Sequence, residues 1–278
     1  MTSRLQMTFL GLSLLACPLL NGQNNCGVQQ IQGTYVATIS GFANYYPYSG
    51  LSVWQFGTDG TVNVPWEAVM FATGRLPVNS YSGTWTLTEN CQFTVNTPTL
   101  TLKGMVVKNG QEIHMTRSSP LTTASTPAAT LAAIDRLTRV TPDKDVVVKC
   151  SVAQLNGTYA KSCTGWMGVA APPAPMQPLT FLGAISLPGD GSFSGGGSLV
   201  VGGKSYELQY QTGTINVSED CTGAARYSLG TGSPTFNEVL HVLEQGKRIL
   251  AVSVSSPLYT PTTTPLQIDL CELNRIDR

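Results

Sequence analysis

The feature that most constrains this chain is an internal repeat. Residues 150–159 (CSVAQLNGTY) closely copy residues 26–35 (CGVQQIQGTY), which lie 124 residues earlier, and six of the ten positions are identical. Further matches follow in the same order, and the offset has grown to 136 residues where residues 137–140 match residues 273–276. Ordered matches whose spacing drifts slowly indicate a duplicated domain with loop insertions.

The repeat divides the chain into a first unit of residues 26–141, a linker of residues 142–149 and a second unit of residues 150–278. Each unit has the commonest size of an independent domain. Because the linker is short, we expect the two units to touch.

Within each unit the hydrophobic period is two. Tyr35, Ala37 and Ile39 alternate with Thr34, Val36, Thr38 and Ser40, and residues 99–102 and 250–255 follow a similar pattern. Strict alternation in Thr- and Val-rich runs predicts half-buried β-strands, and Asp-Gly and Asn-Gly pairs predict the tight turns between them. The pattern predicts about seven to nine strands per unit.

The cysteines connect these strands. Apart from Cys17, six are present, and the repeat places Cys26 and Cys91 where Cys150 and Cys221 stand. The economical pairing is therefore one disulfide per unit, Cys26–Cys91 and Cys150–Cys221.

The remaining cysteines, Cys163 and Cys271, both lie in the second unit and are expected to pair with each other. Cys163 stands at the place of Ile39 in the opening strand, and Cys271 stands in the last strand at the place of Asp135 or Leu137. A bond between them would hold the first and last strands together, which favours a closed sheet. We therefore expect an all-β protein of two tandem small antiparallel β-barrels, with two β-sandwiches of the same strands as the alternative.

The shared motifs also carry a resemblance. The pattern Cys-x-x-x-x-Leu-x-Gly-x-Tyr, then Asp-Gly, then a strand ending in Asp-Cys resembles a broad group of uncharacterised secreted bacterial proteins. The resemblance covers both units and implies small calycin-like barrels of the allene oxide cyclase or dirigent kind. Its motifs are strand starts, turns and a disulfide, so it implies fold and export and no particular activity.

Residues 1–22 are predicted to be an export signal. Arg4 precedes an apolar run at residues 7–16, which is too short to span a bilayer. The alternative is a lipid anchor, because Leu14-Leu-Ala-Cys17 resembles a bacterial lipoprotein box. We expect a secreted or periplasmic protein, or one anchored to the cell envelope through Cys17, without a transmembrane segment.

Composition limits the partners. The formal net charge is zero and only 12% of residues are charged. A nucleic-acid partner needs a basic face, so we expect none. Unknown small molecules, glycans or proteins remain as partners.

The sequence contains no recognisable catalytic motif, and we expect no catalytic residue, no metal and no cofactor. His114 and His241 are not equivalent in the repeat, and Glu89 and Glu219 are equivalent carboxylates beside disulfide cysteines. Asp59 and Asp190 belong to Asp-Gly pairs, which are typical of turns.

Aromatic residues are the candidate ligand contacts. They lie on the opening strands or in regions that could border a barrel mouth: Tyr35, Trp54, Trp66, Tyr159 and Trp166. The sequence predicts a secreted, non-catalytic binding or structural module. The alternatives are a cavity-based enzyme of the cyclase or isomerase kind and an envelope or adhesion lipoprotein.

Overall fold

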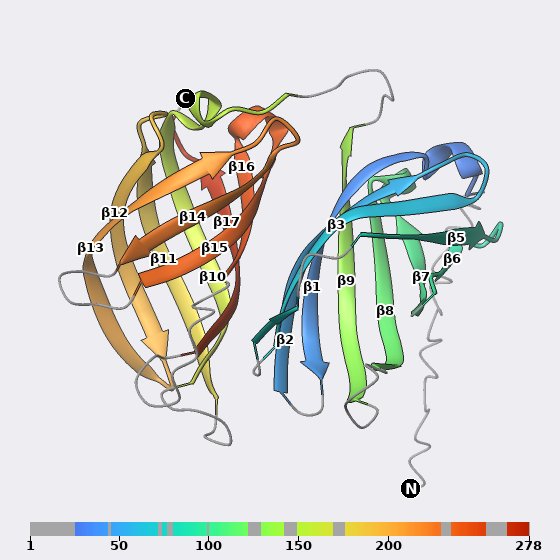
Figure 1. Ribbon diagram of the computed structural model, residues 1–278, viewed down its shortest axis with the longest axis horizontal. Helices are drawn as coiled ribbons and strands as arrows, with labels where there is room; N and C mark the ends of the chain where they lie inside the picture. The colour runs from blue at the N-terminus through green and yellow to red at the C-terminus, as the bar shows by residue number, and fades with distance from the viewer. Residues whose placement is uncertain are drawn as a thin grey trace, which may run out of the picture.

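A computed structural model shows two β-barrels side by side (Figure 1). It describes residues 26–43, 46–71, 74–76, 80–98, 100–121, 129–141, 149–168, 176–228, 235–253 and 266–277. The predicted export signal, Cys17 and most of the linker lie outside these residues. The prediction of two tandem antiparallel barrels is confirmed, and the sandwich alternative does not apply.

The first barrel contains nine described strands and two short 3-10 turns. The strands are β1 (Gly33–Ala43), β2 (Tyr46–Phe56), β3 (Thr61–Phe71), β4 (Gly74–Leu76), β5 (Tyr81–Leu87), β6 (Gln92–Asn96), β7 (Thr101–Val107), β8 (Glu112–Leu121) and β9 (Ala129–Thr141). The turns are η1 (Val28–Gln30) and η2 (Lys108–Gly110). Consecutive strands pair as antiparallel neighbours, β1 pairs with β9, and β4 is a short addition to β3.

The second barrel contains eight described strands and closes by pairing of β10 with β17. The strands are β10 (Gly157–Gly168), β11 (Gln177–Leu187), β12 (Ser192–Val201), β13 (Lys204–Val217), β14 (Thr222–Ser228), β15 (Thr235–Leu243), β16 (Arg248–Ser253) and β17 (Leu266–Arg275). The turns are η3 (Val152–Leu155) and η4 (Glu244–Gly246).

The repeated Gly-Thr-Tyr places a tyrosine in the same position of both barrels. The Tyr35 hydroxyl donates a hydrogen bond of 2.7 Å to the carbonyl of Gly110, and the Tyr159 hydroxyl donates to the carbonyl of Gly246. Both acceptors end turns whose residues have positive φ, with 83° at Gly110 and 88° at Gly246. Glycine tolerates this conformation without steric cost, so the glycine in each turn favours the turn. The tyrosine of each opening strand is hydrogen-bonded to that turn.

Three disulfides join Cys26 to Cys91, Cys150 to Cys221, and Cys163 to Cys271. Cys163 and Cys271 are directly opposed between β10 and β17, with Cα atoms 4.0 Å apart. In the first barrel the opposed pair at this place is Ile39 and Asp135, so Cys271 corresponds to Asp135. Disulfides of this number indicate an oxidising, extracytoplasmic environment.

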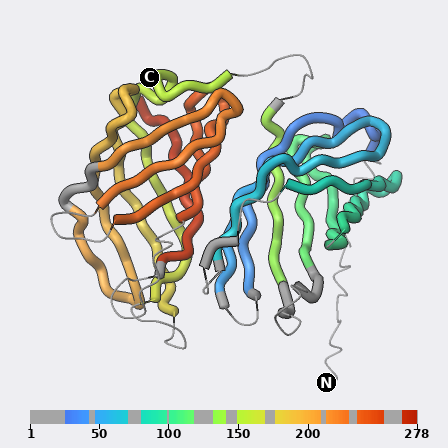
Figure 2. The backbone as a smooth tube through the Cα atoms, in the orientation of Figure 1, coloured from blue at the N-terminus to red at the C-terminus, as the bar shows by residue number. Residues whose placement is uncertain are grey.

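The barrels face each other along β2 of the first and β16 and β17 of the second (Figure 2), and an apolar cluster joins them there. It unites outward-facing residues of β1–β3 with outward-facing residues of β15–β17: Val36, Leu51, Val53, Ala68, Met70, Val239, Leu243, Leu250, Val252 and Ile268. Phe42 and Trp166 add an edge-to-face contact across the barrels, with ring centroids 6.0 Å apart. The interface between the barrels therefore has an apolar core that is separate from the cores inside them.

This cluster corrects one expectation about residues 250–255. Leu250 and Val252 do not face the barrel interior, as half-buried alternation implied, because Ala251 lies on the inside instead. The strand is buried on both faces, since the other barrel covers its outer side.

Among the described residues, none forms a helix that is long and apolar enough to cross a membrane.

A matched pair of substitutions tests the cluster between the barrels. Leu51 and Leu182 occupy equivalent places, opposite Thr38 and Ser162, but Leu51 is fully buried and Leu182 is 66% exposed. We expect Leu51→Asp to lower the free energy of unfolding by about 3–5 kcal/mol and Leu182→Asp to change it by about 0.5 kcal/mol or less. Urea denaturation measures both, and equal losses would contradict an interface in this place.

Candidate functional site

Each barrel interior contains a cluster of buried charged residues. In the first barrel Arg117 (β8) is surrounded by Glu67 (β3) and Asp135 (β9). In the second barrel Lys161 (β10) pairs with Glu238 (β15), and Asp269 (β17) lies near them. These clusters are the only sites in the described interiors where one cation faces two carboxyl groups, so they are the candidate functional sites.

The Arg117 cluster is closely hydrogen-bonded. Arg117 Nε donates to both carboxylate oxygens of Asp135 at 2.8 Å, and an Nη donates to Glu67 Oε2 at 2.7 Å. The Tyr81 hydroxyl donates to the same Glu67 oxygen at 2.9 Å, and Tyr48 lies 3.4 Å from the other Nη. The guanidinium therefore binds two carboxylates at once, which is the geometry that its planar fork favours.

Burial and charge set the pKa values in this cluster. Burial alone would lower the pKa of Arg117, but the Asp135 and Glu67 carboxylates outweigh it and hold the pKa well above its usual value. Burial raises the pKa of Asp135 to about 6, against the opposing effect of Arg117. Burial likewise raises the pKa of Tyr48 and of Tyr81. Arg117 is shared by two carboxyl groups, and of these the fully buried Asp135 becomes protonated at a higher pH than a free aspartic acid does.

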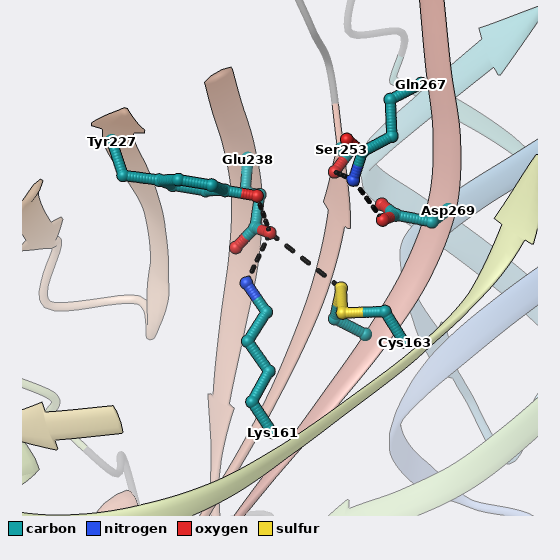
Figure 3. Close-up of a disulfide and its surroundings, with 8 residues drawn as sticks. Lys161, Cys163, Tyr227, Glu238, Ser253, Gln267 and Asp269 are labelled. Carbon is teal, nitrogen blue, oxygen red and sulfur yellow. Dashed lines mark hydrogen bonds and ion pairs between the residues drawn. A yellow bond between two sulfur atoms is a disulfide. The ribbon is translucent and has the colours of Figure 1, made fainter. Parts of the chain in front are cut away.

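The second cluster surrounds the Cys163–Cys271 disulfide (Figure 3). Lys161 Nζ lies 2.6 Å from Glu238 Oε1 and 4.9 Å from the centre of the Tyr227 ring. The Tyr227 hydroxyl donates to the same Glu238 oxygen at 2.9 Å, and that oxygen is 3.8 Å from Cys271 Sγ. Glu238 Oε1 is therefore the shared acceptor for Lys161 and Tyr227.

Asp269 is the less satisfied carboxyl group of this cluster. Its Oδ2 accepts a hydrogen bond from Gln267 Nε2, which also donates to Ser253 Oγ at 3.3 Å. Its Oδ1 is buried and has no hydrogen-bond partner among the described residues. Burial, reinforced by the charge of Glu238, raises the pKa of Asp269 to about 6. The carboxyl group thus lacks full compensation for its charge.

Two small recesses lie on either side of Lys161. The first has a volume of about 20 Å³ and is lined by the polar residues Lys161, Tyr227, Gln267 and Asp269, with Phe181 and Leu199 among its apolar walls. The second has the same volume, about 20 Å³, and is mainly apolar, with Phe193, Ala225 and Ala251 in its wall. Each has room for one or two water-sized groups.

Phe181 and Phe193 fill space beside glycines in the wall of the second barrel. A Cβ on Gly197 would lie 2.9 Å from the Phe181 ring, and a Cβ on Gly213 would lie 2.5 Å from the Phe193 ring. The rings occupy the volume that side chains at these glycines would take. Glycines of β12 and β13 therefore make room for aromatic packing.

The aromatic candidates from the sequence lie outside the described recesses. Tyr35, Tyr159 and Trp54 are fully buried, and Trp54 Nε1 donates to Ser52 Oγ at 2.7 Å. Trp66 packs against the cluster between the barrels, and Trp166 contacts Phe42 there. In the structure, all five side chains take part in packing or in hydrogen bonds within the protein.

The titratable candidates are also dispersed. His114 is about half exposed and contacts Glu112, whereas His241 is buried, and desolvation lowers its pKa to about 4. Glu219 is exposed and pairs with Lys149 at 2.9 Å. Asp59 and Asp190 accept hydrogen bonds from residues two positions later in their turns. Glu89 is exposed in a turn.

A possible metal ligand set is blocked by oxidation. Cys163, Asp269 and Cys271 place their ligand atoms within 4.8 Å of one another, and this is the set found in the described part of the chain. Both sulfurs are consumed by the disulfide, so one carboxylate remains, which is too few ligands for a metal site.

The sequence prediction missed the buried charged residues. Lys161 stands between the inward-facing residues Tyr159 and Cys163, and Asp269 stands two residues before Cys271. The signal available in the sequence was therefore the alternation of the strand, which places every second residue inside the barrel. The partner of Lys161, Glu238, is 77 residues away in sequence, and only the register of eight strands brings the two together.

Comparisons with known proteins add little. No family model matches the chain, and no curated protein matches it. A solved structure of a DUF3598-family protein of unknown function from Nostoc punctiforme aligns over 92% of this chain and 100% of that chain. The sequence identity is 13% and the TM-score is 0.25, values too low to support a conclusion. The resemblance to calycin-like barrels of the allene oxide cyclase or dirigent kind stays a prediction.

The shifted pKa values predict opposing pH effects on stability. Asp135 and Asp269 have pKa values of about 6 in the folded protein and 3.8 in the unfolded chain. When the pH falls from 7 to 5, protonation of each therefore raises the free energy of unfolding by about 1 kcal/mol. His241 has a pKa of about 4 in the folded protein and 6.5 in the unfolded chain, so the same change of pH lowers the free energy of unfolding by about 2 kcal/mol. We expect the native protein to show a nearly flat profile.

Two variants separate these effects. Asp269→Asn should lose stability on acidification from pH 7 to pH 5, and His241→Gln should gain it, as measured by urea denaturation at each pH. Identical profiles for the two variants would show that these groups do not titrate as their burial requires.

The equivalence of Asp135 and Cys271 predicts an additional disulfide. In the double variant Ile39→Cys, Asp135→Cys the two thiols face each other as Cys163 and Cys271 do, and Arg117 keeps Glu67 as its carboxylate partner. A bond closing a loop of about 100 residues is worth roughly 4–5 kcal/mol in the chain-entropy model. We expect a higher Tm than that of the control Ile39→Ser, Asp135→Ser, with no free thiol at either position. Free thiols in the folded variant would refute the equivalence.

Proposed function

We propose that the protein is a non-catalytic structural module that acts outside the cytoplasm through its outer surface. The observation that carries this proposal is the filling of the barrel interiors by side chains. In the second barrel the described recesses measure about 20 Å³ each. Pockets that bind drug-sized ligands are more than ten times larger.

The first barrel is filled by aromatic rings. Trp54 and Phe56 are stacked with ring centroids 6.0 Å apart, and Phe56 makes edge contacts with Tyr35, Trp85 and Phe93. Such contacts stabilise a core beyond the burial of their area. This packing supports a structural role over the binding of a ligand inside the barrel.

The site chemistry gives the enzyme alternative little support. A cyclase or isomerase of the barrel type would need space for its substrate beside an acid or base. In the described interior the ammonium of Lys161 is paired with Glu238, and the sulfurs of Cys163 and Cys271 are bonded to each other. The ammonium of Lys161 and the two sulfurs are therefore already engaged.

Export by residues 1–22 completes the proposal. It agrees with the oxidising environment that three disulfides indicate. A lipid anchor at Cys17 is the alternative and would make the protein an envelope or adhesion component. Intact-mass analysis of the exported protein distinguishes a soluble product that begins near Gly22 from one that begins at a lipidated Cys17.

A ligand screen tests the structural role. We expect fatty acids, terpenoids and oligosaccharides to leave the Tm within about 1 °C, because the recesses among the described residues are too small for them. The control is Phe193→Ala, which enlarges the second recess by a phenyl ring and should gain binding of a small apolar probe such as benzene or indole. A saturable shift of several degrees with a large ligand on the native protein would overturn the proposal.

A further inference from the structure

The buried charges of the second barrel do not balance. Lys161 contributes one positive charge, and Glu238 and Asp269 can contribute two negative charges. Glu238 is matched by Lys161 at 2.6 Å, so the surplus belongs to Asp269, which is fully buried. A buried carboxylate without compensation either takes up a proton or recruits a cation, because the protein interior solvates charge poorly.

The groups around Asp269 leave it short of donors. Gln267 from the same strand binds Oδ2, Ser253 of β16 contributes a hydroxyl, and Lys161 of β10 and Glu238 of β15 are paired with each other. The hydroxyl of Tyr227, from β14, is directed to Glu238. Oδ1 of Asp269 has no partner among the described residues. The position therefore calls for one more hydrogen-bond donor.

A recess of matching size adjoins this carboxyl group. The side chain of Asp269 forms part of its wall, together with Tyr227, Phe181 and Leu199. The volume of about 20 Å³ fits one or two water-sized groups. An unsatisfied acceptor, a negative surplus and a small space thus occur together.

The wall chemistry selects the kind of cation. Ca²⁺ requires six to eight oxygen ligands, Mg²⁺ an octahedron of them, and K⁺ a ring of carbonyl oxygens. This recess has few oxygens, and its remaining walls are the side chains of Lys161 and Gln267, aromatic and aliphatic groups, and disulfide sulfur. Lys161 is itself matched by Glu238, so the three charged groups beside the recess leave a net negative charge. An ammonium ion needs fewer acceptors and is attracted to aromatic faces. Lys161 already shows this arrangement, since its ammonium contacts a carboxylate and lies over the Tyr227 ring.

We propose that the recess beside Asp269 binds a small ammonium ion, ammonium itself or methylammonium, with the Asp269 carboxylate as its counter-ion. The site goes beyond the structural role proposed above, which concerns large ligands and the outer surface. Binding competes with protonation of Asp269, whose burial raises its pKa to about 6, so the site is occupied above that pH and empty below it.

Thermal unfolding in chloride salts of equal ionic strength tests the proposal on the full chain. At pH 7.5, about 0.1 M ammonium or methylammonium should raise the Tm by roughly 2–4 °C relative to sodium, potassium or tetramethylammonium. At pH 5 the difference should vanish. Bound ¹⁵N-ammonium should give a separate, slowly exchanging NMR signal.

Three variants complete the test. Asp269→Asn removes the counter-ion and should abolish the ammonium effect, and Leu199→Phe should abolish it by filling the recess while every charge is kept. The control Glu207→Gln removes one exposed carboxylate from the same barrel and should leave the effect unchanged. An equal response to potassium, a response that persists in Leu199→Phe, or no response in the native protein would each overturn the site. Only the binding of a large ligand would overturn the structural role.

Discussion

Closure of each sheet is the constraint on which the rest of the structure depends. Because β1 pairs with β9 and β10 pairs with β17, each barrel is closed and its interior is separated from water. Any polar group on an inward-facing position must then find its partner inside. Arg117 does so with two carboxylates, and Lys161 does so with Glu238. The buried ion pairs are thus a consequence of closure as much as of the residues themselves.

Much of the fold was predictable because its determinants are local or duplicated. Period-two alternation locates strands, turn pairs such as Asn109-Gly110 locate hairpins, and the repeat multiplies both signals. The buried charges were not predictable, because their partners come from strands far apart in sequence. The half-buried strand predicted at residues 250–255 is instead buried on both faces, because another barrel covers its outer side, and alternation there no longer identifies the interior.

The two barrels share their architecture and differ in their interior chemistry. The charged positions Lys161, Glu238 and Asp269 correspond to Ala37, Leu102 and Ala133 in the first barrel. Both interiors nevertheless place one cation with two carboxyl groups. The fold tolerates such changes because strand pairing and the Tyr-to-turn hydrogen bonds do not involve these side chains. A duplicated barrel can therefore acquire a local binding property without loss of its frame.

The contact between the barrels is heterologous, since it joins β1–β3 of one unit to the last three strands of the other. A contact of this type could in principle be extended by further copies, as in an open array. In the first barrel, however, Lys103, His114 and Thr116 stand where the second has Val239, Leu250 and Val252, and they are exposed. This polar face resembles the outer face of a terminal unit in a repeat protein, and it prevents a further barrel from packing in the same way on this side of the first barrel.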